Sequence, residues 1–463
     1  MEQHICLNKL TINKFVFHLH TGDFFRVFFI YDIMFWSKYN RIFKINNNVY
    51  VIYNYAWNKA VYLVPELKSI VEQHVQSVDE LELIHPTLFQ NLVKAKIVVE
   101  CLTEECMIKN RIQQKLSSEK ILRLTINPTL DCNLRCWYCY EAHNSKSYMN
   151  KETMLAIYKF VESKMTDRLE KVNLSFFGGE PLLAAPKIAI PITQEIVGIC
   201  QNAGKQVSLH FTTNGTLLKP SVVNKIADLQ IPTSFQIAFD GDRSLHNKTK
   251  KWGHLSSYDI VLENINNILQ KQMRINVRCN YTSSNISSFY HLVDDIMLLP
   301  NKDYSLINIT LQRVWQEPAT KELYQEAKNL EEYIFSLGFN GGMGDSTCAQ
   351  SYCYADYDNS FVINYNGDVF KCTARDFKPS HKTGSLGLGG KLKIEDEAKR
   401  SSIRFKDVCN KCSLLPICTI CSQTHLEAEE KCPIQISNEE KEHQIQMRFK
   451  ESFHENIQKS YKV

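Results

Sequence analysis

Residues 121–139, ILRLTINPTLDCNLRCWYC, join a strand-like run to three closely spaced cysteines. The run Ile121–Asn127 alternates apolar and polar residues, which is typical of a β-strand. Cys132, Cys136 and Cys139 follow with the spacing Cys-x3-Cys-x2-Cys. Three thiolates on one tight loop can hold three irons of a cubane 4Fe–4S cluster and leave the fourth iron without a protein ligand. The pattern therefore predicts an iron–sulfur site directly after a strand.

Zinc is the alternative metal for this loop. A zinc site normally has a fourth Cys or His ligand close by, and His143 lies near enough in the sequence to supply one. The whole chain contains 16 cysteines in 463 residues and no visible secretory signal. A disulfide framework is therefore disfavoured, and metal or redox chemistry in the cytoplasm is the expectation.

The overall composition is that of a soluble globular chain. Lys and Arg number 54 against 50 Asp and Glu, so no basic footprint for nucleic acid is present. The most apolar early stretch, Phe15–Trp36, is interrupted by polar and charged residues, and we expect no membrane span there. This stretch differs in character from the residues after it and ends near Met34, so residues 1–37 are an uncertain extension. Either Met1 or Met34 is the true start.

Residues 116–340 alternate between strand-like and helical segments. Repeated strand-then-helix units predict a parallel sheet covered by helices. Six units are too few for a closed eight-stranded barrel, so the expected fold is α/β with a partial (β/α)6 TIM-like barrel. The expected strands are Ile121–Asn127, Val172–Phe177, Val207–Thr212, Ser234–Phe239, Ile275–Asn280 and Leu306–Gln312. Helices are expected at Lys151–Met165, Ser221–Leu229, Tyr258–Gln270, Phe289–Leu299 and Lys321–Leu337.

Smaller units flank the predicted barrel. Residues 38–115 begin with three strand-like and three helical segments, which is a winged-helix-like order. Residues 341–440 are rich in cysteine; they open with a glycine-rich hinge signal at Gly341–Gly344. A hairpin follows, with Asn366-Gly367 as a type I′ turn pair. A polar helical tail, residues 441–463, ends the chain.

The cysteine loop and the strand ends resemble the radical S-adenosylmethionine (radical SAM) superfamily. The resemblance is carried by the cysteine spacing with the aromatic Tyr138 before the third cysteine, by Gly178-Gly179-Glu180, and by similar motifs at later strand ends. It implies a 4Fe–4S cluster at the three cysteines and S-adenosylmethionine on the open iron. The residues it implies for cofactor binding are Gly178, Gly179, Glu180, Thr213, Asn214, Asp240 and Arg278.

Two positions depart from the usual pattern of this family. Ala238 stands where a Ser is frequent before Asp240, and Lys250 stands where an Arg is common. Lys carries the same charge as Arg but lacks its bidentate fork. These changes leave the contacts to the ribose and the carboxylate of the cofactor open. The resemblance names no general base in this chain, and the sequence indicates none.

The later cysteines resemble the SPASM auxiliary domain, which binds one or two further 4Fe–4S clusters. By the interleaved arrangement of that domain, the nearer cluster would be held by Cys348, Cys353, Cys372 and Cys421. The outer one would be held by Cys409, Cys412, Cys418 and Cys432. One residue is missing before Cys421 relative to the SPASM pattern, which puts its role as a ligand in question. A zinc ribbon is the alternative, because paired Cys-x2-Cys units suit tetrahedral zinc.

The same resemblance implies a peptide or protein substrate. Residues 38–115 have the element order of the leader-recognition domain found in maturases of ribosomally made peptides (RiPPs). The expected function is therefore oxidative modification or cross-linking of such a peptide by a 5′-deoxyadenosyl radical, with flavodoxin or ferredoxin as the electron donor. The alternatives are a maturase resembling the anaerobic sulfatase maturases and, more distantly, a non-enzymatic zinc-binding protein.

Overall fold

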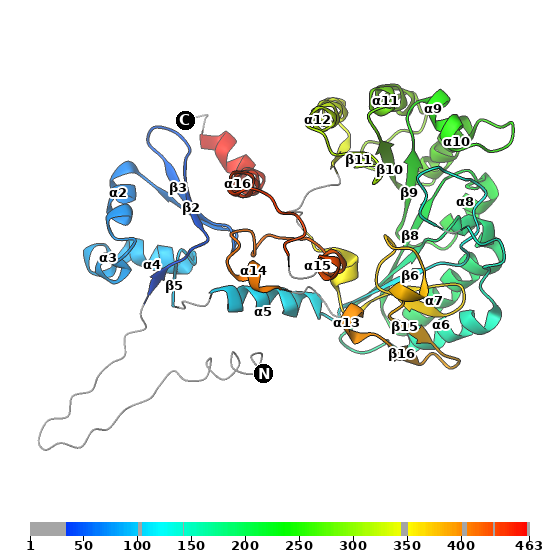
Figure 1. Cartoon of the computed structure of the whole chain (residues 1–463), viewed down its shortest axis with the longest axis horizontal. Coiled ribbons are helices and arrows are strands. Elements are labelled where there is room, and N and C mark those ends of the chain that lie inside the picture. Colours follow the sequence, from blue (N-terminus) through cyan, green and yellow to red (C-terminus); the bar gives the residue numbers. More distant parts are fainter. Residues whose placement is uncertain are drawn as a thin grey trace, which may run out of the picture.

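The computed structural model describes residues 34–100, 104–141, 143–343, 351–400, 405–428 and 431–460. The extension 1–33, Gly344 and Cys348 lie outside the described residues. Two structured regions are joined by the long helix α5 (Glu104–Leu116), with the barrel on one side and the N-terminal unit on the other (Figure 1).

The barrel wall is a run of parallel strands that continues into an antiparallel extension. The order across the sheet is β12-β11-β10-β9-β8-β7-β6-β13-β14-β15-β16, in which the last two strands are β15 (Gly384–Leu386) and β16 (Leu392–Ile394). The parallel strands are β6 (Ile121–Ile126), β7 (Lys171–Phe176), β8 (Gln206–Thr213), β9 (Thr233–Phe239), β10 (Arg274–Tyr281), β11 (Ile307–Arg313) and β12 (Asn340–Met343). The predicted α/β class and partial barrel are confirmed, and all six expected strands are present.

Helices cover the outer face of this sheet (Figure 1). The covering helices are α6 (Lys151–Ser163), α7 (Ile190–Asn202), α8 (Pro220–Ala227), α9 (Arg243–Thr249), α10 (Ser257–Gln270), α11 (Phe289–Met297) and α12 (Lys321–Ser336). Every second strand residue is buried against them in one apolar core, as Leu122, Leu124 and Ile126 are on β6. The alternate residues are mostly polar and only half-buried, and they face the inside of the barrel. This alternation places the polar side chains where a site can form.

The helical stretch before β8 passes a length and composition test for a membrane span. It runs over Pro181–Asn202 through the short helices η1 (Pro181–Ala184) and η2 (Ala185–Ala189) into α7. Its most apolar window is 56% buried inside the molecule. Ile192 and Ile196 of α7 are fully buried in the barrel core, so packing accounts for their apolar character.

The predicted glycine hinge is wrong, because Gly341 and Gly342 lie within β12. This strand pairs in parallel with β11, and Gly341 is opposite Ile309. A Cβ added at Gly341 would lie 1.7 Å from the carbonyl oxygen of Ile309. The glycine is therefore explained by close backbone approach in a strand, which is the other common reason for glycine in such a position.

The predicted hairpin is present, with a different turn. Strands β13 (Ser360–Ile363) and β14 (Asp368–Phe370) are antiparallel, and β13 also pairs in parallel with β6. Gly367 has φ +86°, whereas Asn366 is not among the residues with positive φ. A type I′ turn needs positive φ at both central residues. The loop is instead a three-residue connection with glycine in the left-handed position, closed by a bond from Gly367 N to Asn364 O of 2.9 Å.

The N-terminal unit contains the predicted three strands and three helices. An antiparallel sheet is formed by β2 (Asn40–Lys44), β3 (Tyr50–Asn54) and β4 (Lys59–Leu63). The helices are α2 (Pro65–Gln73), α3 (Val78–Ile84) and α4 (Pro86–Lys94), followed by β5 (Val98–Val99), which pairs with β1 (Phe35–Trp36). One face of the sheet packs on α2–α4 through Ile52 and Leu63.

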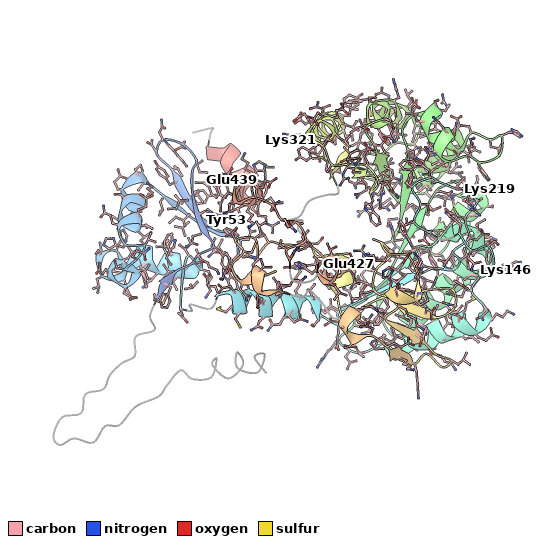
Figure 2. The ribbon with its side chains drawn as sticks, viewed as in Figure 1. Tyr53, Lys146, Lys219, Lys321, Glu427 and Glu439 are labelled. Atoms are coloured by element: carbon pink, nitrogen blue, oxygen red, sulfur yellow. The ribbon has the colours of Figure 1, made fainter. Side chains whose placement is uncertain are left out.

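The other face of this small sheet is covered by the C-terminal part of the chain. Tyr53 and Tyr55 share a core with α5, with the cysteine-rich segment at Leu414, and with α16 (Asn438–Ser460). Tyr53 points from β3 toward α16 (Figure 2). The ring of Phe449 lies 5.4 Å from that of Tyr53. The two ends of the described chain therefore form one packed unit with the later cysteines.

Candidate functional site

The loop with the first three cysteines follows β6 and bounds a cavity inside the barrel. Asp131 accepts a hydrogen bond from the backbone N–H of Cys132 at 2.9 Å, and Cys139 N donates to Cys136 O at 3.1 Å. All three thiols are partly exposed and line the cavity. Burial is the largest cause that raises the pKa of Cys132 to about 12 and raises that of Cys139. The free thiols of Cys132 and Cys139 are therefore neutral, and a metal centre would have to displace their protons.

Two glycines allow the end of β7 to touch this loop. Gly179 N donates to Thr129 O at 3.2 Å, and Glu180 N donates to Asp131 O at 2.7 Å. A Cβ at Gly178 would lie 2.3 Å from Thr129 O, and one at Gly179 would lie 2.1 Å from Asp131 O. Only glycine permits this approach. Both glycines also line the cavity, so the expected Gly-Gly position beside the cysteines is present.

Glu180, which we expected to contact the cofactor, is bonded within the protein itself. Its carboxylate is fully buried and is absent from the lining of the cavity. One oxygen accepts from Thr213 Oγ1 at 2.7 Å and from Leu182 N, and the other accepts from Asn214 N at 2.8 Å. Burial raises the pKa of Glu180 to about 7, against the effect of these donors. Because both carboxylate oxygens accept hydrogen bonds from the protein, Glu180 holds the ends of β7 and β8 together.

Thr213 and Asn214 do line the cavity at the end of β8. The Thr213 hydroxyl donates a hydrogen bond to Glu180, whereas the side-chain amide of Asn214 contacts the cysteine loop. Asn214 Nδ2 donates to Asn133 Oδ1 at 2.9 Å and lies 3.9 Å from Cys132 Sγ. The motif at this strand end therefore contacts the cysteine loop as well as the cavity.

Asp240 is the centre of a buried polar network at the end of β9. It forms a salt bridge with Lys250, whose ammonium donates to Tyr138 Oη at 2.9 Å. Tyr138 donates to Asp240 at 2.6 Å and accepts from Asn280 Nδ2 at 3.0 Å. Although burial alone would lower it, Asp240 and Tyr138 raise the pKa of Lys250. Lys250 thus serves as a point charge for a single carboxylate, a role that does not need the fork of arginine.

This network separates two cavities. The larger one, of about 640 Å³, includes the three cysteines, Lys250 and Arg278 in its lining. The smaller one, of about 330 Å³, is lined by Asp240 together with Trp137. Asp240 lines the smaller cavity and Arg278 lines the larger one, and Tyr138 and Asn280 line both. Arg278 Nε donates to Asn280 Oδ1 at 3.0 Å.

The family comparison decides what this arrangement is. The family model described as the radical SAM superfamily matches residues 126–296, which span β7 to β10 and begin at the last residue of β6. The chain contains a radical SAM domain. Radical SAM enzymes use a 4Fe–4S cluster and S-adenosylmethionine, and these are its cofactors. Cys132, Cys136 and Cys139 are partly exposed on one loop beside these glycines and line one cavity, and three cysteine thiolates are the ligands that such a cluster takes from the protein.

Individual relatives of this radical SAM enzyme have different names. A GTP 3′,8-cyclase of Clostridium perfringens is 24% identical over 61% of this chain and 88% of its own length. The radical SAM cyclopropyl synthase TigE of Paramaledivibacter caminithermalis is 22% identical over 39% of this chain and 41% of its own. The solved structure of anSMEcpe with bound AdoMet and Kp18Cys peptide is 16% identical, with a TM-score of 0.53. It covers 73% of this chain and 99% of anSMEcpe, and this likeness shows the fold alone.

The later cysteines of the radical SAM enzyme form two neighbourhoods. Cys353 and Cys421 share a thiol hydrogen bond, which raises the pKa of Cys353 and lowers that of Cys421. Burial raises the pKa of Cys372, and the nearby Cys421 raises it further. Cys409, Cys412 and Cys432 form the second neighbourhood. Cys421 thus lies beside Cys353 although one residue is missing before it.

In the described part of the chain, no three His, Cys, Asp or Glu side chains form a group that could hold a metal ion. Cys418 packs against the core that includes the second neighbourhood, whereas Cys348 lies outside the described residues.

The polar interior of the barrel is the part of the site that motif reasoning did not identify. His210 and Gln236 line the cavity, and so does Arg123 near the start of β6. Burial lowers the pKa of His210 to about 4, so this side chain is neutral. The signal was present in the sequence, because each of these residues occupies an inward position of an alternating strand.

Proposed function

We propose that this radical SAM enzyme is a peptide maturase that modifies or cross-links a ribosomally made peptide. The observation that carries the proposal is the position of the large cavity. It is bounded on one side by Cys132, Cys136 and Cys139, and on another by Tyr354 and Thr373 of the cysteine-rich segment. A space of about 640 Å³ between two cysteine regions can hold an amino-acid side chain together with the cofactor.

When bound, the cluster and S-adenosylmethionine supply a 5′-deoxyadenosyl radical that abstracts hydrogen from carbon. The residues of this chain orient the reactants and exclude water. Gly178, Gly179, Thr213 and Asn214 would form the cofactor side of the cavity, and Arg278 would face the cofactor from β10. Glu180 and Asp240 would act by holding strand ends and the Tyr138 hydroxyl in place.

Two auxiliary clusters are part of the proposal. The contact between Cys353 and Cys421, with Cys372 nearby, supports the inner set with Cys348 as its fourth ligand. The neighbourhood of Cys409, Cys412 and Cys432, completed by Cys418, supports the outer set. The inner set would border the cavity directly, because Thr373 follows Cys372 in the cavity wall.

The N-terminal unit would bind the leader of the peptide. Strand β4 is an edge of its sheet, and no other strand of the described chain pairs with its outer side. Tyr62 on β4 and Val64 after it are each 48% exposed, which is unusual for a covered edge. An extended peptide can add to such an edge through backbone hydrogen bonds.

The test uses anaerobically reconstituted full-length enzyme, a chemical reductant, S-adenosylmethionine and peptides with leader sequences. The expected result is 5′-deoxyadenosine formation together with a peptide that has lost about two hydrogens, which is the balance of one oxidation or cross-link. Substrates in parallel reactions would be a sulfatase-type cysteine peptide and GTP. Modification of the leaderless sulfatase-type peptide, or conversion of GTP, would contradict the proposal.

Zinc in place of iron in the protein purified under anaerobic conditions would support the non-enzymatic zinc-binding alternative. Flavodoxin and ferredoxin can then be compared with the chemical reductant as electron donors. A donor that supports the same product at a comparable rate would complete the proposed set of partners.

A further inference from the structure

Arg123 places a positive charge deep in the barrel cavity. Its side chain lines the same cavity as Cys132. Arg123 lies three residues before the end of β6, and a strand rises about 3.3 Å per residue, so its backbone is about 10 Å below the strand end that leads to the cysteine loop.

No carboxylate of the described residues neutralises this arginine. Its guanidinium lies 3.6 Å from the ring centroid of Tyr357 and makes one long hydrogen bond, of 3.5 Å, to Ile121 O. Burial lowers the pKa of Arg123, and Tyr357 is the neighbour that opposes this effect. A half-buried cation without a counter-charge is unfavourable in a folded protein. Unpaired charge of this kind is expected where a ligand supplies the partner.

The side chains around Arg123 are neutral and polar. Asn173 is its cross-strand neighbour on β7, and Thr125 and Ser175 line the cavity one layer higher. Asn173 Oδ1 accepts a hydrogen bond from Ser208 Oγ at 2.8 Å. The side-chain nitrogen of Asn173 therefore points away from Ser208. One guanidinium with a neighbouring amide donor matches a single carboxylate better than a triphosphate, which needs several cations.

We infer that the floor of the cavity binds a carboxylate of the substrate, with Arg123 as its partner. The inference rests on the proposed peptide substrate and specifies it further: an Asp or Glu side chain of the peptide enters the barrel. Arg123 would act as a specificity-determining residue, because its guanidinium would pair with the acidic side chain inside the cavity that Cys132 also lines.

The test measures binding of three short probes to the full-length reconstituted enzyme by calorimetry in the presence of S-adenosylmethionine. The probes are acetyl-Gly-Glu-Gly-amide, acetyl-Gly-Gln-Gly-amide and acetyl-Gly-Gln-Gly with a free C-terminal carboxylate. We expect the Glu probe to bind at least about tenfold more tightly than the Gln amide. Tighter binding of the free-carboxylate probe than of the Glu probe would assign the site to a peptide terminus and overturn the side-chain inference.

Arg123→Gln should abolish the preference for the Glu probe and leave the affinity for the Gln amide unchanged. Arg123→Lys should retain part of the preference, and Arg168→Gln, on an 81% exposed arginine, should retain all of it. Equal losses for both amide probes, equal binding of both probes to the wild type, or failure of both to bind would overturn the inference. So would GTP competing with the Glu probe in an Arg123-dependent manner.

A stability measurement separates ligand binding from a structural role. Arg123→Met should unfold at the temperature of the wild type or above it, because it removes an unpaired buried charge. A clear fall in the unfolding temperature would show that Arg123 supports the fold through Tyr357, and would contradict the inference. Formation of 5′-deoxyadenosine reports separately on the proposed function, so an enzyme that cleaves the cofactor but shows no carboxylate preference refutes only the present inference.

Discussion

The contacts that hold the cysteine loop against the barrel are set by single residues. Gly178 and Gly179 bring backbone against backbone, Glu180 ties two strand ends, and Lys250 pairs with Asp240 under the Tyr138 ring. Each of these contacts is buried and specific, so a small change in side-chain size or charge is expected to move the loop.

Substitution of Gly179 by Ala should reduce iron binding at the first site. The new Cβ would lie 2.1 Å from Asp131 O and 2.6 Å from Leu130 O, and the backbone has to move to relieve this overlap. We expect loss of most of the iron of one cluster, about four atoms per chain, in an iron assay after reconstitution. Gly198→Ala is the matched control, because nothing lies within 4 Å of its Cβ. Full iron content in Gly179→Ala would show that the close approach is not needed.

His210 should make the stability of the enzyme depend on pH. Its folded pKa of about 4 lies below the value of about 6.5 expected in the unfolded chain, so below that value the unfolded state binds a proton that the folded state does not. Stability is therefore lost as the pH falls through this window. Between about pH 7 and about pH 5 the wild type should lose about 2 kcal/mol more than His210→Gln. Urea unfolding of cluster-free protein at both pH values measures this, and parallel losses would contradict it.

At the scale of elements, the polar C-terminal helix α16 completes a core rather than a surface. Ile445 and Phe449 are buried, and Phe449 stacks on Phe43 with ring centroids 4.3 Å apart. The pair Arg41–Glu442 adds a charged contact at the edge of this core. The sequence predicted a helical tail without a role, because two buried residues in a polar helix give a weak pattern.

Truncation of Phe449 to Ala should detach α16 from the small sheet. Removing a buried phenylalanine typically costs about 3–5 kcal/mol. The expected result is a lower midpoint in thermal unfolding and faster proteolysis near residues 431–437. Met447→Ala, at a side chain 42% exposed, should change neither property. Equal protease sensitivity in the two variants would show that α16 is held elsewhere.

The six barrel strands were predictable because an inward–outward alternation repeats in each of them. The cysteine loop was predictable from spacing alone. Three features were not predictable from the sequence. Gly341 is a strand residue, but glycine is equally common in hinges and in closely packed strands. The other two are the type of turn at Gly367 and the hydrogen bonds that the chain itself makes to the Glu180 carboxylate. The last two depend on which partner lies opposite, and a sequence pattern does not specify that partner.

At the scale of the whole molecule, the two cysteine neighbourhoods of the C-terminal segment predict separate losses of iron. A protein with three clusters should contain about 12 iron atoms per chain. Cys421→Ala and Cys432→Ala should each lose about four atoms, and the double variant about eight, because the two residues lie in different neighbourhoods. Mössbauer spectroscopy and an iron assay measure this. Loss from Cys432→Ala alone would show that Cys421 is not a ligand.

Strand β13 has a mechanical consequence for this enzyme. It pairs with β6, so the strand that leads to Cys132 and the strand between Cys353 and Cys372 are neighbours in one hydrogen-bonded ladder. Asn127 N donates to Ile363 O at 2.9 Å, which continues the ladder to the last residues before the loop. If both regions hold clusters, as proposed, the distance over which an electron would tunnel between them would be fixed by the register of these two strands.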